Sequence, residues 1–214
     1  MEKIKYGSKY FNVKDTLECG QIFRFKPYKE GYVVYSLSKC AYCYNEGNFA
    51  YIECESEDKD YFCRFFDLDK DYGEIVGKAI SSNYEILRRS AELGKGVRIL
   101  NQDIEETVFS FIVSQNNNIP NIKKIIEKMC LGLGEKKSFM GEDYYAFPTI
   151  EKMAKAPLEF YKSISLGYRA EYIKKLAENI SNGFSLVALN ELSTEELKKS
   201  LVKLYGIGRK VADC

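Results

Sequence analysis

The chain has 214 residues, 45% of them hydrophobic, so it is long enough to bury the cores of one or two domains. It contains no histidine, which excludes mechanisms of the Ser-His-Asp, Cys-His and His-Glu-x-x-His types. Any catalytic group must therefore come from Lys, Asp, Glu, Cys, Tyr or the backbone.

The seven cysteines are an odd number, which favours reduced thiols over a disulfide framework. No apolar run reaches the length of a membrane span, and the charged N-terminus is not followed by a signal-peptide core. We therefore expect a soluble intracellular protein. The net charge of +1 is unevenly distributed: residues 46–75 hold ten acids and three bases, a local charge of −7 that leaves +8 for the remainder. A basic body of this kind is compatible with a DNA-binding face.

Residues 10–55 have the pattern of an antiparallel sheet, with alternating or β-rich runs at 23–25, 32–35 and 48–54 and turn residues between them. Cys40 and Cys43 have metal-ligand spacing, and Cys54 and Cys63 are possible partners, but these two do not form a second CxxC. We favour strand cysteines that face a core and keep a zinc ribbon as an alternative.

From Asp58 onward the apolar period becomes helical. One buried helix is predicted at about Ile104 to Ser114, and another at about Asn121 to Leu131, opened by Asn118 as its cap. Three consecutive asparagines, 116–118, lie between them. They can cap two helices back to back, or they can act as polar side chains that enter a duplex and replace a missing base.

At the C-terminal end, residues 192–204 predict an amphipathic helix with Ser193 or Thr194 as its cap. Gly206 and Gly208 then reverse the chain, and a second helix starts at about Arg209. Such a helix-hairpin-helix presents backbone N–H groups that bind a phosphate without any contact to a base.

Lys210 is unusual because a cation is disfavoured in the first turn of a helix. A lysine must be neutral to act as a nucleophile, and lowering its pKa from about 10.4 to about 8 requires roughly 3 kcal/mol. The helix dipole supplies about 1 to 2 kcal/mol, so we expect Lys210 to be substantially buried. The alternative is a solvated lysine that contacts a phosphate.

Taken together, five segments resemble, in order, the 8-oxoguanine DNA glycosylase/lyases of the helix-hairpin-helix superfamily. They are residues 17–25, 96–103, 109–119, 166–170 and 206–214. The resemblance implies an α+β fold, in which a small N-terminal antiparallel β-sheet domain (1–57) precedes an all-α glycosylase domain (58–214) that contains the helix-hairpin-helix (193–214).

The resemblance also implies the reaction. A damaged guanine is flipped out of double-stranded DNA, neutral Lys210 displaces it at the sugar C1′ to form a Schiff base, and β-elimination cuts the strand. The backbone carbonyl of Gly20 accepts a hydrogen bond from N7–H of 8-oxoguanine, and Cys214 lies against the base. No metal or other cofactor is required. We expect a monomer, located in the cytoplasm with the nucleoid in a prokaryote and in the nucleus in a eukaryote.

By the same resemblance, Asn116 is the wedge that fills the vacated stack, and Tyr168 and Arg169 unstack and hydrogen-bond the orphaned cytosine. The alternative for this pair is a core tyrosine and a surface arginine. Two departures stand out: Asn121 occupies the place of a second cytosine-reading arginine, and Tyr205 replaces a usual proline. Losing a bidentate donor weakens the preference for cytosine by about 1 to 3 kcal/mol.

The catalytic aspartate of the family comes downstream of the lysine motif, and Asp213 belongs to the motif itself. We therefore expect a truncated chain with impaired catalysis. Three functions remain open: the DNA glycosylase/lyase, a non-catalytic helix-hairpin-helix DNA-binding protein or inactive fragment, and a zinc-dependent interaction module.

Overall fold

The computed structural model describes residues 1–213, apart from the side chain of Asn190. It divides into two compact units. The first comprises Met1–Tyr35 and Lys39–Gln102, and the second comprises Ser36–Ser38 and the chain from Asp103 onward.

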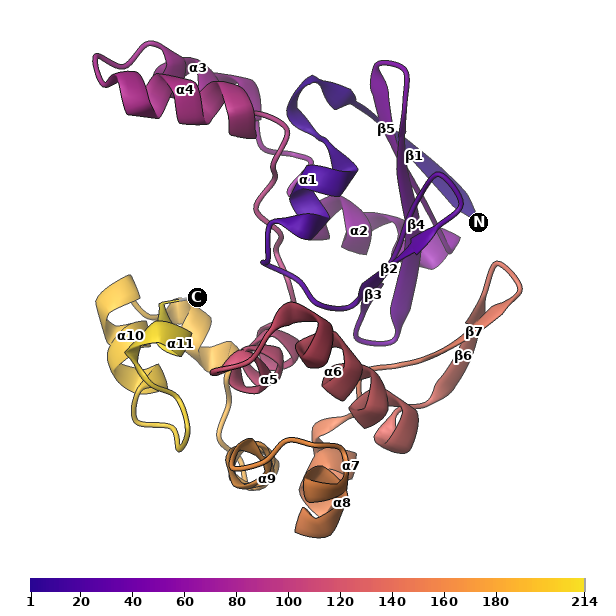
Figure 1. The fold of residues 1–214 in the computed structure, drawn as a ribbon, viewed down its shortest axis with the longest axis vertical. Coiled ribbons are helices and arrows are strands. Elements are labelled where there is room, and N and C mark those ends of the chain that lie inside the picture. Colours follow the sequence, from indigo (N-terminus) through magenta and orange to yellow (C-terminus); the bar gives the residue numbers. More distant parts are fainter. Residues whose placement is uncertain (214) are drawn as a thin grey trace. The chain divides into compact units, whose positions relative to one another are not determined.

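The first unit is built on a five-stranded antiparallel sheet with the order β1-β5-β4-β3-β2 (Figure 1). Its strands are β1 (Glu2–Gly7), β2 (Phe25–Tyr28), β3 (Gly31–Ser36), β4 (Lys39–Glu46) and β5 (Phe49–Cys54). Side chains alternate as expected along β5, where Ala50, Ile52 and Cys54 are buried in the core of this unit. The predicted antiparallel sheet is confirmed, and β1, which the sequence reading missed, pairs with β5 along its edge.

Helices α1 (Val13–Glu18) and α2 (Lys59–Phe65) contribute residues to the same core. The unit also contains the short 3-10 helices Ser8–Tyr10 and Ser56–Asp58 and helices α3 (Tyr72–Ile80) and α4 (Glu85–Gly94). The aromatic rings of Phe62, Phe65 and Phe66 are buried in the core. The predicted domain boundary after residue 57 therefore differs from the structure, which places it between Gln102 and Asp103. The physical reason is that the apolar face of α2 belongs to the sheet core.

The cysteines of the sheet are buried thiols. Cys43 and Cys54 belong to the core, and burial raises the pKa of Cys54 to about 11 and that of Cys43 well above its usual value. Within residues 1–213, no three His, Cys, Asp or Glu side chains are grouped to hold a metal ion. The core interpretation of these cysteines thus agrees with the structure.

The second unit is mainly helical. It contains α5 (Ile104–Ser114), α6 (Ile119–Leu133), α7 (Ile150–Lys155), α8 (Leu158–Ser163), α9 (Arg169–Ser181), the 3-10 helix Val187–Glu191, α10 (Thr194–Leu201) and α11 (Arg209–Ala212). The predicted α+β fold, with a β-sheet unit followed by a helical unit, is confirmed, and the helical unit also contains an antiparallel hairpin of β6 (Lys136–Phe139) and β7 (Glu142–Tyr145). Met140 and Gly141, both at positive φ, make its two-residue turn.

Three predicted helix starts are confirmed by their caps. The side chains of Asp103, Asn118 and Ser193 accept hydrogen bonds from backbone N–H groups of the first turns of α5, α6 and α10. Ser193 and Glu196 form a complete capping box. Within residues 1–213, no helix is both long and apolar enough to cross a membrane.

Candidate functional site

In the first unit, the turn at Gly20 is held by the segment that follows α4. Gly20 has φ +95°, which favours glycine, and it comes directly after the C-terminal end of α1. The side chain of the next residue, Gln21, donates to the carbonyl of Arg98 at 2.8 Å and accepts from the N–H of Leu100 at 2.9 Å. Gln102 in turn donates to the Gln21 carbonyl at 2.6 Å. The segments 17–25 and 96–103 therefore form one hydrogen-bonded structure that fixes Gly20.

We call the contacts of Gln21 with Arg98 and Leu100 the Arg98 clamp. The side chain of Arg98 itself is 0% exposed. Its guanidinium donates to the carbonyls of Phe66 at 2.8 Å and Lys70 at 3.1 Å, and also to the carbonyl of Asp67. Its charge lies 4.0 Å from the centre of the Tyr72 ring. Sequence reasoning gave Arg98 no role, although it lies inside a matched segment.

In the second unit, the predicted hairpin connects α10 and α11. Leu201, Leu204 and Ile207 bury its apolar side. Gly206 has φ +86°, and a Cβ at this position would lie well inside van der Waals contact of the Tyr172 side chain. Gly208 has φ −89° and caps α11, and a Cβ there would meet no atom within 4 Å. Only Gly206 is therefore required by the backbone to be glycine.

Lys210 is the second residue of α11, and the predicted burial of its side chain is wrong, because the side chain is exposed. The physical reason is that α11 comprises only four residues, and its partly buried side chains are those of Val211 and Ala212. Asp213 pairs with Lys198 of α10 at 2.7 Å and so serves the hairpin itself. Cys214, the predicted base contact, lies outside the described residues.

The three asparagines between α5 and α6 have different roles. Asn118 caps α6, and Asn117 donates to the Val113 carbonyl at 3.2 Å. Asn116 has a left-handed backbone with φ +46° and is exposed. The capping interpretation thus holds for Asn118, and the wedge role of the exposed Asn116 stays a prediction.

Tyr168 and Arg169 begin α9, and the structure reverses the alternative of a core tyrosine and a surface arginine. Tyr168 is 51% exposed, whereas Arg169 is only 8% exposed. The guanidinium of Arg169 donates to the carbonyls of Leu166 at 3.2 Å, Asn116 at 3.0 Å and, through two nitrogens, Gln115. These four contacts involve four of its five N–H donors. Arg169 therefore has only one further N–H group with which to contact a cytosine. Tyr168 is the more accessible residue of the pair.

Gln115 links this loop to the hairpin. Its side-chain nitrogen donates to the Gly206 carbonyl at 2.6 Å, while its own carbonyl accepts from Arg169. The segments 109–119, 166–170 and 206–213 are therefore hydrogen-bonded to one another. No role was predicted for Gln115, and the available signal was its place at the C-terminal cap of α5, directly before the asparagines.

The two residues that depart from the family pattern, Asn121 and Tyr205, both make contacts in this unit. Asn121 donates to the Asn117 side chain at 2.8 Å and so joins the loop network. Tyr205 is 50% exposed and packs edge-to-face on Tyr172, with ring centres 5.1 Å apart. The Lys175 ammonium lies 4.0 Å from the centre of the Tyr205 ring.

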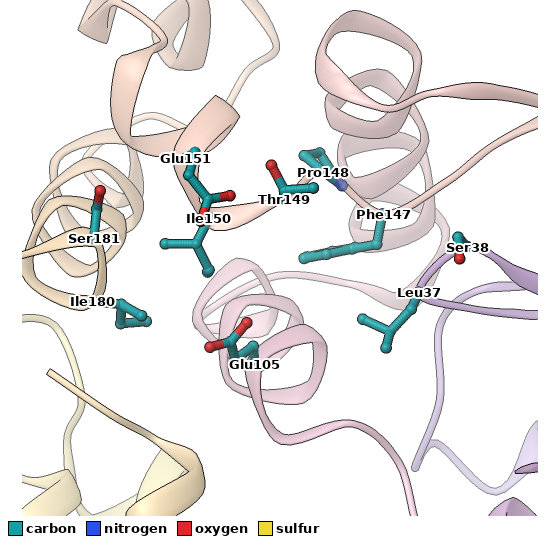
Figure 2. Close-up of a pocket in the computed structure, with 10 residues that line it drawn as sticks. All are labelled: Leu37, Ser38, Glu105, Phe147, Pro148, Thr149, Ile150, Glu151, Ile180 and Ser181. Carbon is teal, nitrogen blue, oxygen red and sulfur yellow. The ribbon is translucent and has the colours of Figure 1, made fainter. Parts of the chain in front are cut away.

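A cavity of about 440 Å³ lies elsewhere in the second unit (Figure 2). Its lining comes from the 36–38 turn, α5, α7 and its preceding segment, and α9, and it includes Glu105 and Glu151. Burial, followed by the charges of Asp103 and Glu151, raises the pKa of the Glu105 carboxyl. None of the predicted site residues that the structure describes lines this cavity, and Gly20 of the expected base pocket is not among its lining residues.

Several known proteins are similar to this chain. The family described as "8-oxoguanine DNA glycosylase, N-terminal domain" matches residues 3–108. An N-glycosylase/DNA lyase of Saccharomyces cerevisiae is 29% identical over 178 residues, which cover 76% of this chain and 46% of the yeast protein. The chain spans 34% to 52% of the length of three curated relatives that it matches.

Two solved structures from Clostridium acetobutylicum are similar over nearly the whole chain. The apo-form of its 8-oxoguanine glycosylase/lyase has a TM-score of 0.93 at 35% identity, covering 100% of this chain and 76% of that one. The same enzyme in complex with double-stranded DNA containing cytosine opposite 8-oxoguanine has a TM-score of 0.89 at 36% identity, covering 96% and 72%. The chain therefore belongs to the 8-oxoguanine DNA glycosylase/lyase family.

Proposed function

We propose that the protein removes 8-oxoguanine from duplex DNA and cleaves the resulting abasic site through a Schiff base on Lys210. The observation that carries the proposal is the assembly of the hairpin, the Asn116 loop and the start of α9 into one hydrogen-bonded cluster. The reaction is inferred from the family to which the chain belongs, and the cluster is proposed as the surface that binds the DNA.

The hairpin is proposed to bind the DNA backbone. Gly208 is exposed, and the space around its Cα is open, so a phosphate can approach the N–H groups at the start of α11. Such a contact carries no sequence information, which suits an enzyme that must find a lesion in any sequence.

Asn116 is proposed to enter the stack when the damaged base leaves it. Its exposure supports this role, and the hydrogen bond from Arg169 to its carbonyl holds its backbone in place at 3.0 Å. Tyr168, half exposed beside it on α9, is proposed to lie against the orphaned cytosine.

For Lys210, the proposed step requires an uncharged amine. The nitrogen lone pair forms a bond to C1′, the glycosidic bond breaks, and the base leaves with the electron pair and a proton. The remaining N–H proton passes to the ring oxygen O4′ as the C1′–O4′ bond breaks and the C=N bond of the Schiff base forms. β-Elimination then removes a C2′ proton, and the 3′ C–O bond breaks with the phosphate leaving with the electron pair. Since Lys210 is exposed within residues 1–213, we propose that the bound duplex removes water from the amine.

The backbone carbonyl of Gly20 is proposed to recognise the lesion by accepting the N7–H hydrogen bond, which guanine cannot donate. The clamp of Gln21 by Arg98 and Leu100 supports this assignment, because it fixes the peptide next to Gly20. The proposed partner is duplex DNA, bound by a monomer, in the nucleoid-containing cytoplasm of a prokaryote or in the nucleus of a eukaryote.

A non-catalytic DNA-binding protein is the second candidate, and the exposure of Lys210 favours it, because an exposed lysine can simply contact a phosphate. Borohydride reduction during incubation with an 8-oxoguanine duplex separates the two. The proposal expects a covalent protein–DNA adduct that Lys210→Gln abolishes and the nearby control Lys199→Gln preserves. DNA binding without any adduct would support the second candidate.

A further inference from the structure

Gln115 makes contacts with two segments that the proposed function uses separately. Its side-chain nitrogen donates to the Gly206 carbonyl at 2.6 Å. Its backbone carbonyl accepts from the Arg169 Nε at 2.7 Å, and the same guanidinium donates to the Asn116 carbonyl at 3.0 Å. Gln115 thus contacts the hairpin through its side chain and Arg169 of α9 through its backbone, and Arg169 also holds Asn116, the next residue in the wedge loop (residues 115–118).

Both ends of this link are rigid for local reasons. Gly206 is confined by its positive φ and by the Tyr172 side chain packed against its Cα. Asn116 has a left-handed backbone, and Arg169, which holds its carbonyl, is buried. A hydrogen bond between two rigid segments fixes their separation, whereas a bond between mobile segments would only limit it.

We propose that Gln115 is a positioning residue that sets the spacing between the phosphate-binding hairpin and the inserting Asn116. The inference rests on the proposed function, since it assigns these two contacts to one duplex. Hairpin binding and Asn116 insertion must then occur at a fixed register along the DNA, and loss of the Gln115 donor uncouples them.

The chemistry of the bond defines the variants. Gln115→Glu keeps the side-chain shape but replaces the N–H donor with an oxygen that faces the Gly206 carbonyl. Gln115→Ala removes the side chain. Tyr161→Phe is the matched control, because the buried Tyr161 hydroxyl also donates to a backbone carbonyl, that of Met153, at 2.6 Å in the same unit. All three variants lose one side-chain-to-backbone hydrogen bond.

The first measurement is binding to a duplex that contains a stable abasic-site analogue, relative to binding to an undamaged duplex. We expect both Gln115 variants to lower this ratio about tenfold, mainly through weaker binding to the abasic duplex, while Tyr161→Phe leaves it unchanged. An unchanged ratio in Gln115→Glu and Gln115→Ala would overturn the inference.

The second measurement is amide hydrogen exchange in the DNA-free protein, at Ile207 and Val211 of the hairpin. Exchange should accelerate roughly three- to tenfold in both Gln115 variants and stay as in the parent protein in Tyr161→Phe. Equal exchange in all four proteins would overturn the inference even if DNA binding changed. If the parent protein does not prefer the abasic duplex, the proposed function fails, and exchange alone decides whether Gln115 fixes the hairpin.

Discussion

Gly206 and Gly208 are two residues apart and look alike in the sequence, but the backbone needs only one of them. Gly206→Ala places a Cβ at positive φ and against Tyr172, so we expect it to lower the free energy of unfolding by at least about 1 to 3 kcal/mol. Gly208→Ala, at φ −89° in open space, should cost less than about 1 kcal/mol. Urea denaturation of both variants measures this, and equal losses would contradict the assignment of Gly206 as the strained position.

Glu105 and Glu151 line the same cavity, yet their pKa values are shifted in opposite directions. Burial raises the pKa of Glu105, whereas the N–H of Glu151 itself and the Thr149 hydroxyl lower the pKa of Glu151. A raised folded-state pKa means that the ionised form destabilises the fold, and this cost is absent below the unfolded pKa of about 4.3.

Glu105→Gln should therefore raise the melting temperature at pH 7 and leave it almost unchanged near pH 3. For Glu151 the sign is reversed: its lowered pKa stabilises the fold at pH 7, so Glu151→Gln should lower the melting temperature there and not near pH 3. Thermal unfolding at both pH values tests the pair. A shift for Glu105→Gln that is the same at both pH values would show that packing, and not ionisation, is responsible.

Substitution of Asn121 tests how the protein recognises the base opposite the lesion. An arginine in this place would supply a bidentate donor, so Asn121→Arg should increase the preference for excision opposite cytosine roughly 5- to 100-fold. The assay is single-turnover excision with each of the four bases opposite 8-oxoguanine. If the parent protein already suppresses excision opposite A, G and T as strongly as Asn121→Arg does, the assigned role of residue 121 is wrong.

At the scale of the elements, the three consecutive asparagines between α5 and α6 differ in their contacts and exposure. Asn118 caps α6, so Asn118→Ala should lower the free energy of unfolding by about 1 kcal/mol. Asn116 is exposed and is the proposed wedge, so Asn116→Ala should cost less than that but should weaken binding to abasic DNA. Denaturation together with DNA titration separates the two, and a stability loss for Asn116→Ala as large as that for Asn118→Ala would contradict this division.

Elements with strong local signals could be predicted from the sequence. The helix at Ile104–Ser114 and the capping by Asn118 and Ser193 agree with the structure, because capping chemistry acts within a few residues. The β6–β7 hairpin was missed, because its strands have only four residues each and its turn signal is a single glycine after Met140. Strand β1 was missed although its exposed lysines alternate with Ile4 and Tyr6, because these two apolar residues are a weak signal that the pairing with β5 completes.

The functional roles of the candidate site residues stay predictions, but the structure tests their environments. The sequence proposed Lys210, Asn116 and Arg169, whereas the exposure of Lys210 and the burial of Arg169 depend on contacts between segments far apart in the chain. Gln115 and Arg98 were not predicted, because their side chains donate to backbone carbonyls. Every residue has such a carbonyl, so the sequence does not indicate which one accepts the bond.

At the scale of the whole molecule, the proposed reaction draws on both compact units. The first unit supplies the Gly20 turn, held by the Arg98 clamp, and the second supplies the hairpin, the wedge loop and Lys210. The contacts that hold Gly20 all lie within the first unit, and those that join the hairpin to the wedge loop all lie within the second. A single substitution should therefore disturb either lesion recognition or DNA-backbone binding, and not both. In the proposed function, lesion recognition is assigned to the first unit, and backbone binding and the covalent step are assigned to the second.

The central claim is that the Lys210 amine becomes covalently bonded to the sugar of the damaged nucleotide. The most direct measurement is borohydride trapping on an 8-oxoguanine duplex, followed by proteolysis and mass spectrometry of the nucleotide-bearing peptide. We expect a modified peptide in which Lys210 carries the reduced sugar adduct. An adduct confined to another lysine, such as Lys203, or efficient excision of the base without any adduct, would contradict it.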